Sequence, residues 1–172
     1  GRIFLKASTV DLPGTLKANG VTQGGSVSAQ GDVIFQTGAI EANGNSGGDI
    51  TLQANHILQA GSLAAQGSTG PGGSISVAAD SALIQTAFAS IDVSGATQGG
   101  SIALTTPNGL AFLSGTSQAN GTQGGTIHVL AQDIMLAAAT LDASGSNQGG
   151  TVLVGGDYQG ANPNLQNAQT VT

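Results

Sequence analysis

The chain has 172 residues, of which 29 are glycine, 3 are basic and 9 are acidic, and it contains no tryptophan and no cysteine. Hydrophobic residues make up 39% and charged residues 7%, whereas disordered chains combine low hydrophobicity with high charge. The net charge of -6 disfavours binding to a phosphate backbone, so no nucleic-acid partner is expected. No apolar run approaches the roughly 18 residues of a membrane-spanning helix, so no transmembrane segment is expected.

A recurring Gly-Gly pair divides the chain into repeats. Successive pairs are separated by 23, 25, 27, 25 and 25 residues. The pairs are Gly24-Gly25, Gly47-Gly48, Gly72-Gly73, Gly99-Gly100, Gly124-Gly125 and Gly149-Gly150. A second small turn precedes each pair, and a fixed period of about 20 to 50 residues is the signature of a solenoid.

The residues that follow each Gly-Gly pair alternate between apolar and mixed positions. The second residue after the pair is Val27, Ile50, Ile75, Ile102, Ile127 or Val152, and the fourth is Ala29, Leu52, Val77, Leu104, Val129 or Val154. A period of two predicts a half-buried β-strand, since a helix would require a period of 3.6 residues.

A corner of Asp and Asn residues follows this strand, at Asp32, Asn55, Asp80, Asn108 and Asp133. We expect these residues and the glycines to supply left-handed or turn backbone. The corner leads into a second, less regular strand that includes residues 33–35, 57–58, 83–84, 110–112 and 134–136. Turn stabilisation is enough to explain the Asp and Asn residues at this corner, so no cofactor is expected. The alternative is a calcium site, because stacking would bring the side-chain oxygens of these residues together.

A third strand precedes the small turn and repeats a large and then a small inward residue. The large position holds Leu16, Ile40, Leu63, Ile91, Ser117 and Leu141, and the small one holds Ala18, Ala42, Ala65, Val93, Ala119 and Ala143. Three strands and three turns in about 25 residues predict an all-β parallel β-helix of about six to seven coils. Residues 1–172 then form a single segment, and we expect it to belong to a longer shaft because uncovered solenoid edges invite association.

Few residues suggest catalysis. His56 and His128 occupy different positions in their repeats, so stacking does not bring them together. Asp92 and Asp142 share an outward column two coils apart, about 10 Å at the spacing of stacked strands. That separation overlaps the pair of carboxylates in an inverting glycosidase, so a carbohydrate-active β-helix is the alternative to a solvated strand face.

The most regular surface feature is a glutamine directly before the Gly-Gly pair, at Gln23, Gln98, Gln123 and Gln148. Stacked amides can hydrogen-bond along a rod, which gives this candidate polar ladder a structural role. The alternative is contact with glycan hydroxyls, although Tyr158 and four phenylalanines offer little aromatic surface for sugars. Irregular spacing places a shortened turn at Ser46 and extra residues at 68–71 and near Phe88. If any part of the shaft makes specific contacts, these loops are the first candidates.

The runs at 92–95, 141–145 and especially 149–160 resemble the large exoproteins of two-partner secretion systems, the filamentous-haemagglutinin type. Residues 106–110 (Thr-Pro-Asn-Gly-Leu) are similar to that family's Asn-Pro-Asn-Gly-Ile motif, and residues 162–165 match its Asn-Pro-Asn-Leu motif. The two motifs occur in the reverse of the order expected in the family's secretion domain. This order favours a stretch of the repetitive shaft, or its end near Tyr158.

The resemblance implies a right-handed β-helix that is exported by a partner transporter in the outer membrane. It also implies a location outside the cell, at the bacterial surface or in the extracellular matrix, and a role in adhesion, aggregation or biofilm cohesion. We therefore expect a non-enzymatic rod segment of an adhesin whose partners include polysaccharide or like rods.

Overall fold

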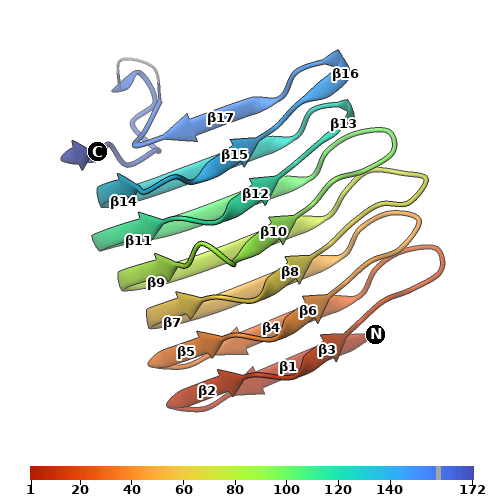
Figure 1. The fold of residues 1–172 in the computed structure, drawn as a ribbon, viewed down its shortest axis with the longest axis horizontal. Helices are drawn as coiled ribbons and strands as arrows, with labels where there is room; N and C mark the ends of the chain where they lie inside the picture. The colour runs from red at the N-terminus through yellow and green to blue at the C-terminus, as the bar shows by residue number, and fades with distance from the viewer. Residues whose placement is uncertain (158–159) are drawn as a thin grey trace.

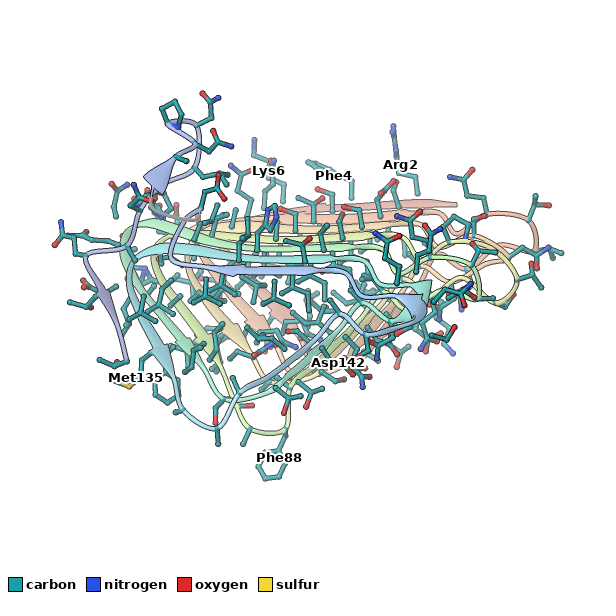
Figure 2. All side chains as sticks on the ribbon, turned by 90° about the horizontal axis from the view of Figure 1, so that it is seen from above. Arg2, Phe4, Lys6, Phe88, Met135 and Asp142 are labelled. Carbon is teal, nitrogen blue, oxygen red and sulfur yellow. The ribbon has the colours of Figure 1, made fainter. Side chains whose placement is uncertain are left out.

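The computed structural model is a parallel β-helix in which about six coils of about 25 residues stack along one axis (Figure 1). The structure describes residues 1–157 and 160–172, so the predicted shaft end at Tyr158 lies outside the described residues. Seen along the stacking axis, the coil is three-sided (Figure 2). The prediction of an all-β solenoid is confirmed.

The first face of the helix is the flattest and contains the strand that follows each Gly-Gly pair. Its strands, in their order in the sheet, are β1 (Arg2–Lys6), β4 (Ser26–Gln30), β7 (Asp49–Gln59), β9 (Ser74–Gln85), β11 (Ser101–Leu113), β14 (Thr126–Leu136) and β17 (Thr151–Val154).

The second face belongs to the same sheet, because the long strands β7, β9, β11 and β14 bend around a corner and continue along it. The face is completed by β2 (Thr9–Leu12), β5 (Val33–Gln36) and β18 (Thr170–Val171). The register shifts at the bend, for example between Ala54 and His56, as at a β-bulge. In these four coils the predicted Asp and Asn corner is thus a bend within one strand and not a turn between two.

The third face is a separate six-stranded sheet of short strands. Its members are β3 (Thr15–Lys17), β6 (Ala39–Glu41), β8 (Ser62–Ala64), β10 (Ser90–Asp92), β12 (Thr116–Gln118) and β15 (Thr140–Asp142). Between the third face and the next Gly-Gly pair, β13 (Gly121–Gln123) pairs with β16 (Gly145–Gln148).

The apolar columns predicted from the repeat line the core, apart from Ser117 in the third-face column and Val152, which is 40% exposed at the last coil. On the first face the stacked residues are Val27, Ile50, Ile75, Ile102, Ile127 and Val152. On the third face they are Leu16, Ile40, Leu63, Ile91, Ser117 and Leu141. Each full burial of such an aliphatic side chain contributes about 1.5 to 3 kcal/mol, so the columns supply the main stabilisation of the stack.

The Gly-Gly pairs are required by the close approach of neighbouring coils. A Cβ atom on Gly100 would overlap the carbonyl oxygen of Gly73, and the same conflict recurs in the other coils. Left-handed or turn backbone was expected at these glycines and at the Asp and Asn corner, and the left-handed alternative is wrong. Among the described residues, positive φ occurs only at Ala138, Gly155, Gly156 and Gly160.

The two ends of the stack differ. At the first coil, β2 pairs only with β5, so its other edge is open. At the last coil the chain returns, and β18 pairs with the second-face part of β14. The backbone nitrogen of Thr172 donates to Ile134 at 2.9 Å, and Leu136 donates to Thr172 at 2.8 Å. In residues 1–157 and 160–172, no helix has the length and apolar character needed to cross a membrane.

Candidate functional site

Carboxylate and amide side chains of neighbouring coils are hydrogen-bonded to each other along the third face and the small turn that follows it. In the first two coils, the side-chain amide of Asn19 donates from Nδ2 to Oε2 of Glu41 at 2.9 Å, and Lys17 lies 3.2 Å from the same oxygen. The Asn19 hydrogen bond, with a smaller contribution from Lys17, lowers the pKa of Glu41 below its ordinary value of 4.5. The carboxylate is thereby held ionised next to an amide of the preceding coil.

Asp92 repeats this arrangement two coils further along. Its Oδ2 accepts a hydrogen bond from the side chain of Gln66, and its Oδ1 accepts one from the backbone nitrogen of Ser94 at 2.8 Å. Both carboxylate oxygens are therefore engaged by neutral donors, which fix the small turn that begins at Ser94.

Asp142 is held in the same way. Its Oδ1 accepts from the hydroxyl of Ser144 at 2.5 Å and from the backbone nitrogen of Ser144 at 3.0 Å, and its Oδ2 accepts from Asn120 at 2.9 Å. The Ser144 hydroxyl, followed by Asn120, lowers the pKa of Asp142 below its ordinary value of 3.8. A carboxyl group that protonates a leaving group needs a raised pKa, so these bonds oppose that role.

The register places Asp92 and Asp142 on either side of Gln118 in one column, as the sequence predicts. They are two strand spacings apart, about 10 Å. The basic residues of the chain, Arg2, Lys6 and Lys17, all belong to the first coil. Asp142, which Figure 2 shows on the outer surface of the third face, therefore has no cationic neighbour to hold an acidic sugar.

The two histidines lie on different faces. His128 pairs with Ala103 on the first face, whereas His56 pairs with Val33 on the second. The structure agrees with the expectation that stacking does not bring them together.

The four candidate glutamines are all exposed, but they do not form one column. Gln98, Gln123 and Gln148 follow one another in register, whereas Gln23 pairs with Ser46. Among the residues that the structure describes, no hydrogen bond joins the side chains of these four glutamines. Backbone bonds hold the column instead, for example from Gly99 to the carbonyl of Gln123 at 2.8 Å.

A different glutamine column, which the sequence analysis did not identify, lies inside the helix. Gln36, Gln59 and Gln85 are stacked on the second face and are at most 1% exposed. Gln59 donates from Nε2 to the carbonyl of Gly61 at 2.7 Å, and Gln36 donates to Gly38 at the same distance. These amides lie two residues after the inward Ile34, Ile57 and Leu83, so strand alternation places them in the core once the structure shows which side is inward.

An open groove of about 650 Å³ follows the corner between the first and second faces. One side contains a single register column near the end of the first face, namely Lys6, Gln30, Gln53, Ala78 and Thr105. The other contains the corner residues Asp32, Asn55, Asp80 and Pro107. Because these residues come from five successive coils, the groove runs along the stacking axis.

The groove combines apolar surface from alanines and Pro107 with polar side chains that are mostly neutral. Gln30 donates from Nε2 to Oε1 of Gln53 at 3.3 Å, so neighbouring amides can satisfy each other when no ligand is present. Asn108, just beyond the groove, donates to Oδ1 of Asp80 at 2.6 Å. In the described ranges, no group of three or more His, Cys, Asp or Glu side chains is arranged to hold a metal ion.

Comparisons with protein-family models, with curated proteins and with solved structures found no match for this chain.

Proposed function

We propose that this chain is a rod segment of a secreted bacterial adhesin, and that its axial groove contacts a polysaccharide. The observation that carries the proposal is the groove itself, whose volume of about 650 Å³ falls within the range of about 300 to 1,000 Å³ for ligand sites. An elongated groove that crosses five coils, with the amides of Gln30 and Gln53 at the strand spacing, is suited to an extended polymer. A compact metabolite would use only one or two of its coils.

The charge of the groove narrows the class of polymer. Asp32 and Asp80 line it, whereas Lys6 is the one basic residue among those that line it. Acidic polysaccharides would meet like charge over most of its length. The favoured ligands are therefore neutral or amine-bearing glycans, whose hydroxyl or amino groups pair with amide and carboxylate oxygens.

The other parts of the proposal rest on the resemblance to filamentous-haemagglutinin exoproteins and on the rod architecture. They are export through an outer-membrane partner transporter, a location at the cell surface or in the matrix, and a role in adhesion or biofilm cohesion. The regular core and the ladders of fixed carboxylates support a mechanical role, because they give a stiff rod of repeated coils.

Two double variants test the groove. Gln30→Ala with Gln53→Ala removes adjacent amides from the groove, and Gln98→Ala with Gln123→Ala removes the same pair from the polar ladder at another corner. On a glycan array of neutral, amine-bearing and acidic polymers, we expect the first variant to lose at least about tenfold in binding, because it loses several hydrogen bonds. We expect the second to bind as the parent chain does. Equal glycan binding by the parent chain and both variants would refute the proposal that the groove binds the glycan. Loss of binding in the second variant alone would assign binding to the predicted polar ladder.

Catalysis through Asp92 and Asp142 is the rival function, and their hydrogen bonds to neutral donors do not favour it. Asp92→Asn with Asp142→Asn should leave folding, secretion and adhesion nearly unchanged in a rod segment. If the parent chain cleaves a glycan and this variant does not, the protein is instead an enzyme that uses these two carboxylates.

A further inference from the structure

The outer surface of the second face contains an apolar column, unlike that of the other two faces. Its outward column consists of Phe35, Leu58, Ile84, Phe112 and Met135, which follow one another in register in five successive coils. Phe35, Ile84 and Met135 are each at least 40% exposed. We call these five side chains the apolar stripe, and Figure 2 shows Met135 projecting outward from its last coil.

The contrast with the other faces makes the stripe unusual. The outward column at the start of the first face holds Ser26, Asp49, Ser74, Ser101 and Thr126, and that of the third face holds Glu41, Ala64, Asp92, Gln118 and Asp142. The neighbouring outward column of the second face is mixed and holds Val33, His56, Ala82, Leu110 and Asp133, so the stripe is the outward column of this face that is apolar in all five coils. Contiguous exposed apolar surface of this kind marks an interaction site.

We propose that the stripe pairs with the stripe of a second copy of this chain, with the two rods side by side and antiparallel. A straight row of apolar groups along the axis is complementary to another such row over its full length. No charged residue interrupts the stripe, although each copy carries a net charge of -6. Two copies therefore meet here without bringing carboxylates into the centre of the contact.

The direction of pairing follows from the end of the column. Asp11 continues the stripe at its first coil, since it pairs with Phe35. Parallel rods with matched stripes would place Asp11 against its own copy, and two carboxylates repel when they face each other. Antiparallel rods with a two-fold axis at Ile84 avoid this contact, because Phe35 then faces Met135 and Leu58 faces Phe112.

The same axis accounts for Phe88, which is 92% exposed at the corner beyond the second face. Phe88 belongs to the same coil as Ile84, so the two-fold axis brings the two Phe88 rings to one edge of the contact.

Five coils of four-residue strand give roughly 300 Å² of contact area on each copy, and each Phe88 adds about 150 to 200 Å². The total approaches about 1,000 Å² for both copies, which is the low end for specific association and indicates weak, reversible pairing.

Because the chain contains no cysteine, a single introduced thiol is the only one that can form a disulfide between two copies. Ile84→Cys lies on the proposed axis, and Ser76→Cys, in the same strand β9 but on the first face, is the matched control. Under mild oxidation we expect Ile84→Cys to form disulfide-linked dimers at least about tenfold faster than Ser76→Cys, since pairing holds its thiols together. Equal rates would overturn the proposal.

Mixtures of two variants test the direction. If the rods are antiparallel, Phe35→Cys cross-links with a tagged Met135→Cys and neither variant cross-links well alone. Efficient cross-linking of Phe35→Cys with itself would refute the antiparallel arrangement.

Sedimentation of the cysteine-free chain gives an independent measurement of pairing. Its apparent mass should rise above 16.6 kDa with concentration, and Ile84→Asp should abolish this rise while Ser76→Asp keeps it. A monomer at every concentration would contradict pairing.

Discussion

At the scale of single residues, the interior of the helix contains several polar side-chain atoms without partners among the described residues, and Gln85 contributes two of them. Neither polar atom of the Gln85 side chain has a hydrogen bond among the described residues, although the side chain is 1% exposed. Its neighbour in the column, Gln59, uses Nε2 to bond both Gly61 and Gln36. The next residue beyond Gln85 is Leu113, so the column changes from amide to aliphatic at this point.

Gln85→Leu should therefore stabilise the chain. The substitution removes an unsatisfied buried amide, whose cost is about 1 to 3 kcal/mol, and extends the aliphatic part of the column toward Leu113. Urea unfolding should show a higher midpoint with an unchanged slope.

Gln36→Leu is the matched control, because Gln36 donates to Gly38 at 2.7 Å and accepts from Gln59 at 3.3 Å. Its removal should destabilise the chain. Destabilisation by Gln85→Leu as large as that by Gln36→Leu would mean that Gln85 has partners equivalent to those of Gln36.

At the scale of the coil, the Gly-Gly corner sets how closely the coils can stack. Gly100→Ala places a Cβ atom on the carbonyl oxygen of Gly73, and a backbone atom cannot move away without displacing its whole coil. We expect a loss of about 1 to 3 kcal/mol in the free energy of unfolding, as for other overpacked sites.

Gly149→Ala is a control at the first glycine of the last pair, where an added Cβ atom would have no neighbour within 4 Å. Its φ is not positive, so alanine should be neutral or stabilising by up to about 1 kcal/mol through the unfolded state. Chemical denaturation of both variants measures the difference. Similar losses in both would show that the corner requires glycine for backbone freedom and not for space.

The elements differ in how far the sequence predicts them. The first and third faces have one apolar and one polar side, so their alternation directly predicts which residues stack in the core. On the second face Ile34 is inward and Phe35 outward, and both are apolar, so alternation cannot tell the two sides apart. This is why the apolar stripe and the buried Gln36 column require the structure. The axial groove also requires it, since it arises from the relative position of residues in different coils.

At the scale of the whole molecule, stability should vary along the stack, because each coil contacts only its neighbours. Strands β7, β9 and β11 are bonded on both sides, whereas β1 and β3 are bonded on one side only. The second-face part of β14 is an exception near an end, since it lies between β11 and β18.

Hydrogen exchange should reveal this gradient. We expect the slowest amide exchange in β7, β9 and β11 and the fastest in β1 and β3, because local opening at an end breaks fewer contacts. The amide of Ile134, next to β18, should exchange more slowly than that of Asp11, which faces the open edge of β2. Native-state exchange followed by mass spectrometry or NMR measures both comparisons. Uniform protection along the stack would show that the six coils open as one cooperative unit and that the returning segment at 170–172 adds no local stability.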